Sequence, residues 1–101
     1  MTQIISLNIE EIRKLFKNHK VEKAYVFGSV LTANFTNESD IDFLVRFEKN
    51  LPPLEKGELW WDLHDKLRGL FNREIDLVTE SSLKNPYFIL ELDRTKELIY
   101  G

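Results

Sequence analysis

The feature that most constrains the fold of this chain is the alternation of polar and apolar residues between Asp40 and Phe47. Side chains two residues apart on a β-strand leave the same face, so the alternation predicts a strand over Ile41–Phe47. Its apolar face consists of Ile41, Phe43, Val45 and Phe47, and its other face of Asp40, Asp42, Leu44 and Arg46. A strand with one apolar face must pack against other elements, which predicts a sheet covered by helices.

The remaining segments have helical or strand periodicity of their own. Helices are predicted over Ile9–Asn18, Glu55–Phe71 and Pro86–Thr95, and strands over Val21–Phe27, Glu74–Thr79 and Leu98–Tyr100. Asn8 and Asn85 are the expected N-caps of the first and last helices, and a short helix is expected after Gly28. Strands separated by helices in 101 residues predict an α/β fold, with a small mixed β-sheet flanked by helices, as one domain over residues 1–101.

Composition and charge narrow the classes of function. The 17 acidic and 14 basic residues give a net charge of −3, which argues against electrostatic capture of a nucleic-acid backbone. The chain has no cysteine, which excludes disulfides, thiolate metal sites and a thiol nucleophile. Met1–Leu7 lacks the pattern of a signal peptide, and no stretch is apolar for about 18 residues, so we expect a soluble cytoplasmic protein without a membrane segment.

Gly28 and Ser29 follow the predicted strand Val21–Phe27, at the point where a helix is expected to begin. Backbone amides point outward at such a junction, and phosphate groups bind well there. Glycine lets a ligand approach the main chain closely, and the Ser29 hydroxyl adds a donor or a metal contact. A plain turn explains the same two residues, so this pair alone leaves both interpretations open.

Asp40 and Asp42 lie two residues apart, so their carboxylates leave the same face with Cα atoms roughly 6.5 Å apart. Their mutual repulsion would be relieved by a divalent cation, although a solvated edge-strand face is the alternative. Asp76 lies between Ile75 and Leu77 on another predicted strand. If that strand pairs beside the first, the carboxylates share one pocket, and such oxygen ligands suit Mg²⁺. An exposed acid at a strand end explains Asp76 equally.

Together these segments resemble the nucleotidyltransferases of the DNA polymerase β superfamily, and within it the minimal nucleotidyltransferases of prokaryotic antitoxin pairs. The family pattern is a hydrophobic residue, Gly-Ser, about a dozen variable residues, acid-hydrophobic-acid, and later hydrophobic-acid-hydrophobic. It stands here as Phe27-Gly28-Ser29, Val30 to Ser39, Asp40-Ile41-Asp42-Phe43 and Ile75-Asp76-Leu77. The resemblance extends from the first predicted helix to Tyr100-Gly101.

The resemblance implies a two-metal transfer of a nucleoside monophosphate. Asp40 and Asp42 would hold both Mg²⁺ ions, Asp76 would complete the site of the ion that activates the attacking hydroxyl, and Gly28 and Ser29 would hold the triphosphate. Asp76 is also the implied candidate for a general base. The implied reaction transfers AMP from ATP to a hydroxyl, expected to be that of a tyrosine, on a HEPN-type toxin, for which the protein acts as antitoxin.

The chain departs from the family pattern after Gly-Ser, where many members carry an arginine and then a glycine. Thr32 and Ala33 stand at these positions, so a cation that would steady the triphosphate is missing. A catalytically weak or inactive antitoxin that neutralises its partner by binding is therefore the second hypothesis. Arg46 could replace the cation, but we favour a role in neutralising the aspartates or a place on the surface. Transfer to a small molecule or RNA is a third hypothesis, against which the acidic charge counts.

Neither the two histidines nor four of the aromatic residues are assigned catalytic roles. His19 is expected to close the first helix, and His64 is expected to be a surface or capping residue. The aromatics are expected to serve as core or partner contacts rather than as a base-stacking platform: Trp60, Trp61, Tyr87 and Phe88.

Overall fold

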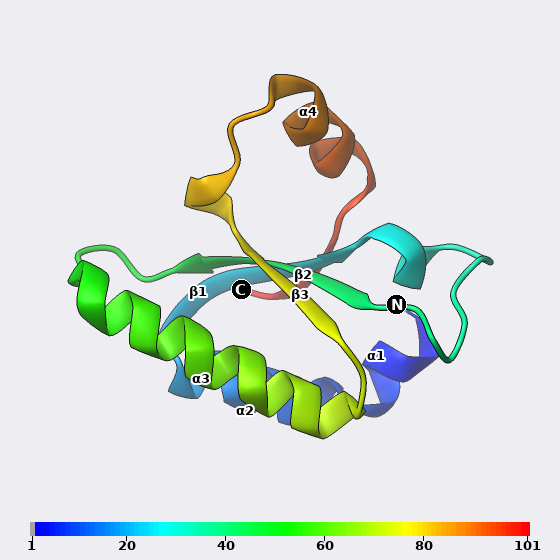
Figure 1. The fold of residues 1–101 in the computed structure, drawn as a ribbon, viewed down its shortest axis with the longest axis horizontal. Helices are drawn as coiled ribbons and strands as arrows, with labels where there is room; N and C mark the ends of the chain where they lie inside the picture. The colour runs from blue at the N-terminus through cyan, green and yellow to red at the C-terminus, as the bar shows by residue number, and fades with distance from the viewer. Residues whose placement is uncertain (1) are drawn as a thin grey trace.

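The computed structural model describes residues 2–101, so only Met1 lies outside it. It contains a four-stranded sheet in the order β3-β2-β1-β4 (Figure 1). The strands are β1 (Val21–Phe27), β2 (Ile41–Phe47), β3 (Ile75–Thr79) and β4 (Glu97–Tyr100). β1 runs antiparallel to β2 and β4, whereas β2 and β3 are parallel, so the sheet is mixed as predicted.

Helices flank the sheet on both faces, with α4 standing alone on one side and the other helices on the opposite side (Figure 1). They are α1 (Gln3–Leu7), α2 (Ile9–Asn18), α3 (Pro53–Phe71) and α4 (Pro86–Thr95), with 3₁₀ turns η1 (Gly28–Leu31) and η2 (Glu80–Ser82). None of the helices within residues 2–101 combines the length and the apolar character needed to cross a membrane.

The alternation along β2 divides its side chains between two clusters, as predicted. Ile41, Phe43 and Val45 are fully buried in the main core, together with Phe16 of α2 and Leu63 of α3. On the opposite face, Leu44 joins Phe27 and Leu92 in a smaller cluster beneath α4. Asp42 shares this second face with Leu44, so the predicted acidic face lies on the same side of the sheet as α4.

Capping follows the sequence at one helix and departs from it at another. The Asn85 side chain accepts hydrogen bonds from the backbone amides of Tyr87 and Phe88, so it caps α4 as predicted. Asn8 does not cap α2 with its side chain, which instead donates to the Ile4 carbonyl at 2.8 Å. The sequence prediction was wrong there because α1, which was not predicted, ends at Asn8 and occupies this side chain.

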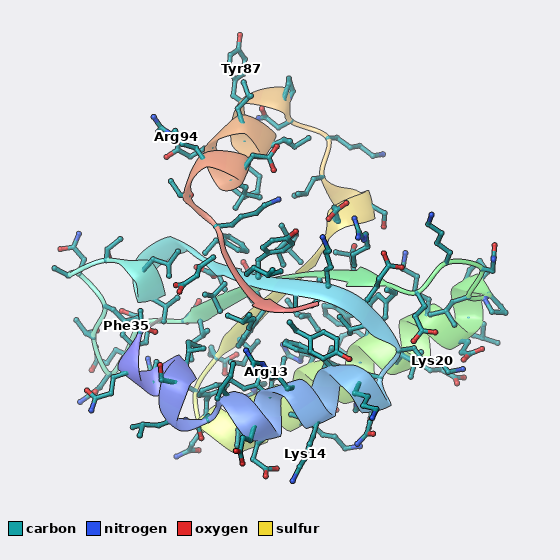
Figure 2. The ribbon with its side chains drawn as sticks, turned by 180° about the vertical axis from the view of Figure 1, so that it is seen from behind. Arg13, Lys14, Lys20, Phe35, Tyr87 and Arg94 are labelled. Atoms are coloured by element: carbon teal, nitrogen blue, oxygen red, sulfur yellow. The ribbon has the colours of Figure 1, made fainter. Side chains whose placement is uncertain are left out.

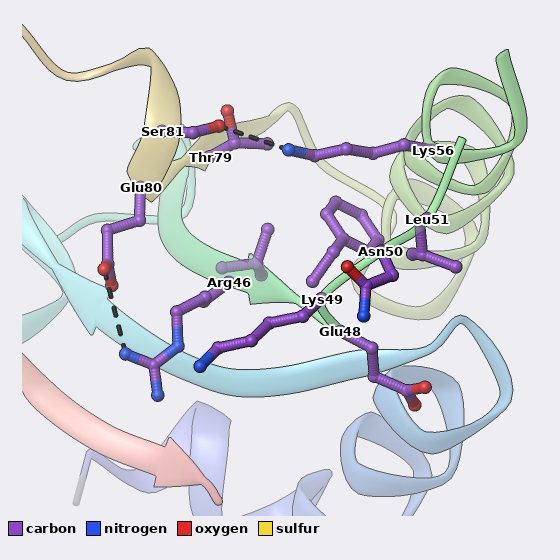
Figure 3. Close-up of a pocket in the computed structure, with 11 residues that line it drawn as sticks. Arg46, Glu48, Lys49, Asn50, Leu51, Lys56, Thr79, Glu80 and Ser81 are labelled. Carbon is purple, nitrogen blue, oxygen red and sulfur yellow. Dashed lines mark hydrogen bonds and ion pairs between the residues drawn. The ribbon is translucent and has the colours of Figure 1, made fainter. Parts of the chain in front are cut away.

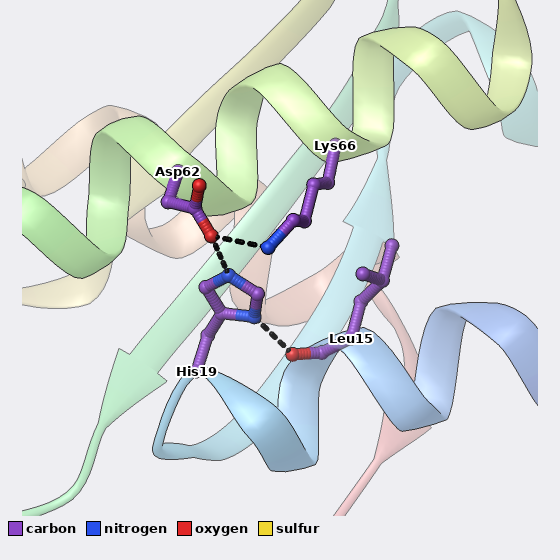
Figure 4. Close-up of polar contacts among 4 residues, drawn as sticks. All are labelled: Leu15, His19, Asp62 and Lys66. Carbon is purple, nitrogen blue, oxygen red and sulfur yellow. Dashed lines mark hydrogen bonds and ion pairs between the residues drawn. The ribbon is translucent and has the colours of Figure 1, made fainter.

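Both histidines join secondary-structure elements, and neither is a simple surface residue. His19 does close α2, but its ring is only 4% exposed and connects α2 with α3 (Figure 4). One ring nitrogen lies 2.7 Å from the Leu15 carbonyl oxygen, and the other lies 2.6 Å from the Asp62 carboxylate. His64 stacks on Trp60 and lies 3.0 Å from the Ile75 carbonyl, so it helps to attach α3 to β3.

The outer elements are attached to the sheet to different degrees. Arg13 of α2 donates to the Ile99 carbonyl at 3.1 Å, which fastens α2 to the edge strand β4. Tyr87, by contrast, points away from the molecule at the far end of α4 and is 83% exposed (Figure 2). Tyr87 is therefore no part of the core, and a partner contact remains the prediction for it.

Candidate functional site

The pairing of β2 with β3 brings two of the predicted acids together. Asp42 is the register partner of Asp76 in the parallel ladder, so their side chains leave the same face of the sheet side by side. Asp40 lies one residue before β2 and close enough to act on Asp42 electrostatically. Burial, and then the charges of Asp76 and Asp40, raise the pKa of the Asp42 carboxyl to about 6. The expected pairing of the two acidic strands is thus confirmed.

Gly28 lies directly against this group of acids. Its φ of +75° belongs to the left-handed region, and a β-carbon at this position would collide with the Oδ2 atom of Asp42. The contact arises because Phe27, at the end of β1, is the cross-strand partner of Asp42. Glycine is therefore required both by the backbone conformation and by the carboxylate beside it.

Ser29 completes the set of residues that sequence reasoning singled out. Its hydroxyl donates a long hydrogen bond of 3.5 Å to the Asp40 carbonyl, which links η1 to the segment entering β2. The helix expected after Gly28 is a single 3₁₀ turn of four residues. All the predicted site residues thus lie at one end of β2 and its two neighbours, and we call them the aspartate site: Gly28, Ser29, Asp40, Asp42 and Asp76.

The donor set of the aspartate site suits Mg²⁺ without forming a complete cage. Among residues 2–101, no group of three acidic or histidine side chains is arranged to hold a metal ion by itself. Mg²⁺ commonly uses one or two carboxylates and takes its other ligands from water and substrate phosphates, so an open set of this kind fits it. Burial, and then the negative charges of Asp76 and Asp40, raise the pKa of Asp42, and a bound cation would offset those charges.

Arg46 is on the same strand face as Asp42 but lies four residues further along β2. The usual rise per residue of a strand places its Cα roughly 13 Å from that of Asp42. Its guanidinium pairs with Glu22 at 2.8 Å and Glu80 at 3.8 Å. It lines a cavity of about 320 Å³ that also contains Lys49 and Lys56 (Figure 3). The interpretation that Arg46 neutralises the aspartates is therefore wrong, because glutamates at the other end of the strand neutralise it instead.

Thr32 stands at the position where the family pattern led us to expect arginine, and its side chain forms hydrogen bonds within its own loop. Its hydroxyl donates to the Ser29 carbonyl at 2.9 Å and accepts from the amide of Asn34 at 3.2 Å. An apolar cavity of about 470 Å³ is lined by Gly28 and Thr32 and by Phe88 and Leu92 of α4. Sequence reasoning did not find this cavity, since α4 approaches η1 only in the folded chain.

Arg73 is a second residue that sequence reasoning missed. It lies between α3 and β3, and its guanidinium donates to the carbonyls of Thr36 and Ser39 in the loop before Asp40. A single basic residue in a short connection has no periodicity or spacing that would mark it. Its contacts are to neutral carbonyls, so it braces the loop and is not placed to offset the missing cation near Thr32.

Comparison with known proteins gives a consistent family. The family model described as "Polymerase beta, Nucleotidyltransferase" matches residues 10–101. The protein adenylyltransferase MntA of Thermococcus cleftensis is 36% identical over 87 residues, which cover 78% of this chain and 84% of that protein.

Solved structures share the fold. A chain in the crystal structure of a toxin–antitoxin complex with AMP-PNP superposes with a TM-score of 0.72 at 25% identity, covering 93% of this chain and 73% of that chain. A chain in the complex of a tri-AMPylated HEPN toxin from Shewanella oneidensis with an MNT antitoxin has a TM-score of 0.66 at 24% identity, covering 95% and 71%. With the family model matching nearly the whole sequence, the chain belongs to the polymerase beta nucleotidyltransferase family and is a nucleotidyltransferase.

Proposed function

We propose that this protein transfers AMP from ATP to a hydroxyl group, that of a tyrosine, on a HEPN-type toxin, and that it thereby acts as an antitoxin. The observation that carries the proposal is the register of Asp42 with Asp76, with Gly28 held against Asp42. The relative from Thermococcus cleftensis is named a protein adenylyltransferase, and a structural neighbour is a toxin–antitoxin complex with AMP-PNP. Both support a protein acceptor and an adenine nucleotide donor.

Each residue of the aspartate site has a role in this proposal. Asp40 and Asp42 would hold Mg²⁺, with Asp76 completing the set. Bound Mg²⁺ would offset the charge of the phosphates and of the attacking oxygen. Gly28, which has no side chain, would let a phosphate approach the main chain of η1 closely, and the Ser29 hydroxyl is a further donor.

Asp76 is the residue that we assign to proton transfer. Its side chain is exposed, whereas that of Asp42 is partly buried, so an acceptor hydroxyl can approach Asp76 from solvent. A carboxylate within hydrogen-bonding distance of the hydroxyl would accept its proton as the oxygen attacks the α-phosphorus and pyrophosphate leaves. The apolar cavity beside Gly28 and Phe88 is the place that we assign to the base of the nucleotide.

The setting of the reaction is part of the same proposal. We propose that residues 1–101 act as one nucleotidyltransferase domain in the cytoplasm, where ATP and Mg²⁺ are present. The net charge of −3 makes direct binding to nucleic acid an unfavourable alternative.

The second candidate function is neutralisation of the toxin by binding alone. It is favoured by Thr32, whose hydroxyl is bound within its loop and supplies no positive charge to a triphosphate. Nucleotide uptake would then occur without transfer.

Mass spectrometry of the partner toxin separates the two functions. After incubation with ATP and Mg²⁺, AMP transfer predicts a mass gain of one or more AMP units on the toxin, lost in Asp40→Ala and Asp42→Ala proteins that remain folded. Unmodified toxin in a stable complex would support neutralisation by binding, and undiminished transfer by both variants would contradict the role of the aspartates.

A further inference from the structure

One arginine, Arg73 in the segment that enters β3, holds the loop before β2 in place. The Nη1 atom of Arg73 donates to the Thr36 carbonyl at 3.0 Å and to the Ser39 carbonyl at 2.8 Å. Its guanidinium also lies 4.7 Å from the centre of the Phe35 ring, a cation–π contact. A single side chain thus contacts three residues of the loop.

The loop presents a preformed turn to this arginine. The Ser39 amide donates to the Thr36 carbonyl at 3.1 Å, and the Thr36 amide donates to the Ser39 hydroxyl at 2.9 Å. Arg73 binds the Thr36 carbonyl, which the turn itself uses, and the Ser39 carbonyl, which immediately precedes Asp40. The position of Asp40 is therefore determined by a fixed turn and a fixed guanidinium.

Asp40 needs such support because it lies outside the strand ladder. The pairing of β2 with β3 begins one residue later, where the Ile41 amide donates to the Glu74 carbonyl at 3.2 Å. On the other side, the Asp40 carbonyl accepts a long hydrogen bond from the Ser29 hydroxyl. The negative charge of Asp42 acts on Asp40, and this repulsion opposes the approach of the two carboxylates.

We infer that Arg73 is a positioning residue that holds Asp40 beside Asp42 and Asp76, ready to bind Mg²⁺; this inference rests on the function proposed above. Arg73 forms no ion pair with a carboxylate within the part of the chain that the structure describes, and its donors are directed at backbone carbonyls instead. Arg68, five residues earlier in the sequence, differs from Arg73 in both respects: its side chain is half exposed, and it pairs with the Glu74 carboxylate on the surface.

Substitution of Arg73, with Arg68→Gln as the matched control, tests the inference. Both changes remove one guanidinium from the same region, but only Arg73→Gln releases the turn. Loss of residues that orient a metal ligand typically weakens metal affinity about 10- to 100-fold. We therefore expect Arg73→Gln to raise the Mg²⁺ concentration for half-maximal ATP binding at least about tenfold, with Arg68→Gln within about twofold of the unmodified protein.

Two further variants separate positioning from simple loss of charge. Arg73→Lys keeps the charge and one nitrogen that can donate, but it lacks the planar guanidinium that lies over the Phe35 ring, so we expect only partial recovery. Phe35→Leu keeps both hydrogen bonds and should have a smaller effect than Arg73→Gln. Because Asp40 itself is retained, saturating Mg²⁺ should restore AMP transfer in Arg73→Gln.

Hydrogen exchange of the nucleotide-free protein gives a readout that does not depend on activity. In Arg73→Gln, the hydrogen-bonded amides of Thr36 and Ser39 should exchange at least about tenfold faster, while those of β1 remain unchanged. Unchanged exchange, an unchanged Mg²⁺ requirement, or a defect that high Mg²⁺ does not restore would each overturn the inference. Failure of the unmodified protein to bind ATP with Mg²⁺ would refute the proposed function instead, while the exchange result would still report on Arg73.

Discussion

Gly28 is in contact with the Asp42 carboxylate, so a β-carbon at this position would force the carboxylate to move. The two residues come from neighbouring antiparallel strands, where Phe27 and Asp42 are register partners. The contact explains why a residue without a side chain, in a left-handed conformation, stands at the end of β1. It also brings together the turn that we propose to bind the phosphates and the carboxylate that we propose to bind Mg²⁺.

Gly28→Ala should destabilise the fold by roughly 1 to 3 kcal/mol, the usual cost of a strained backbone position, and should displace Asp42. Gly57→Ala is the matched control, because nothing lies within 4 Å of a β-carbon at this position of α3. Alanine there should stabilise the helix by roughly 0.5 to 1 kcal/mol. Urea unfolding of both proteins measures the difference, and equal stability of the two would refute the contact.

The raised pKa of Asp42 predicts a pH-dependent effect of its removal. A carboxyl whose pKa is higher in the folded state, about 6 against its ordinary 3.8, opposes folding once it ionises. Its cost is absent below about pH 4, develops between about pH 4 and 6, and is complete above about pH 6.

Asp42→Asn should therefore raise the melting temperature of the metal-free protein at about pH 7.5, by roughly 4 °C or more, and leave it nearly unchanged at about pH 3.5. Asp65→Asn, on the exposed face of α3, is the control and should have no such profile. Mg²⁺ should stabilise the unmodified protein more than Asp42→Asn at the higher pH. A lower melting temperature for Asp42→Asn at about pH 7.5 would count against this electrostatic description.

His19→Leu should destabilise the protein without affecting nucleotide binding. The substitution removes the contacts of the ring with the Leu15 carbonyl and with the Asp62 carboxylate, at an expected cost of about 1 to 3 kcal/mol. Hydrogen bonds from Lys66 and then from His19 lower the pKa of Asp62, so its share of the stability is present at neutral pH and is lost as the pH falls. Urea unfolding checks the cost, with exposed Lys17→Ala as control; a stability equal to that control would exclude the bridge.

Thr32→Arg tests whether the missing cation limits turnover. An arginine at this position would stand beside Gly28 and Ser29, where charge develops on the phosphates, so AMP transfer should accelerate by at least about tenfold. Asn34→Arg adds the same charge two residues further along the exposed loop and should change the rate little. If both variants transfer AMP at the unmodified rate, the weakness expected from Thr32 has another cause.

The sequence predicted those elements whose residues carry local rules. The alternation from Ile41 to Phe47 defined β2 to the residue, and the Asn85-Pro86 pair defined the start of α4 because an N-cap and a first-turn proline act locally. The pairing of β2 with β3 was only a condition of the sequence prediction, because membership of one sheet fixes neither which strands are neighbours nor that these two run parallel.

Other features depend on contacts between distant segments and leave no local mark. α1 spans only five residues, too few for a helical pattern, and its presence removed the expected cap at Asn8. The burial of His19 depends on α3, which is far away in sequence. Arg73 and Arg46 could not be assigned in advance, because their partners lie on loops and strands whose packing the sequence alone does not reveal.

The proposed function depends most on the joint binding of Mg²⁺ and nucleotide by carboxylates from β2 and β3. Calorimetric titration of ATP with and without Mg²⁺ tests it directly, using Asp76→Asn and the surface control Asp93→Asn, which lies on α4 and pairs with Lys96. We expect ATP binding that depends on Mg²⁺. Asp93→Asn should retain this binding, and Asp76→Asn should weaken it at least about tenfold. Equal ATP affinity in Asp76→Asn, or binding that persists after Mg²⁺ is removed, would contradict it.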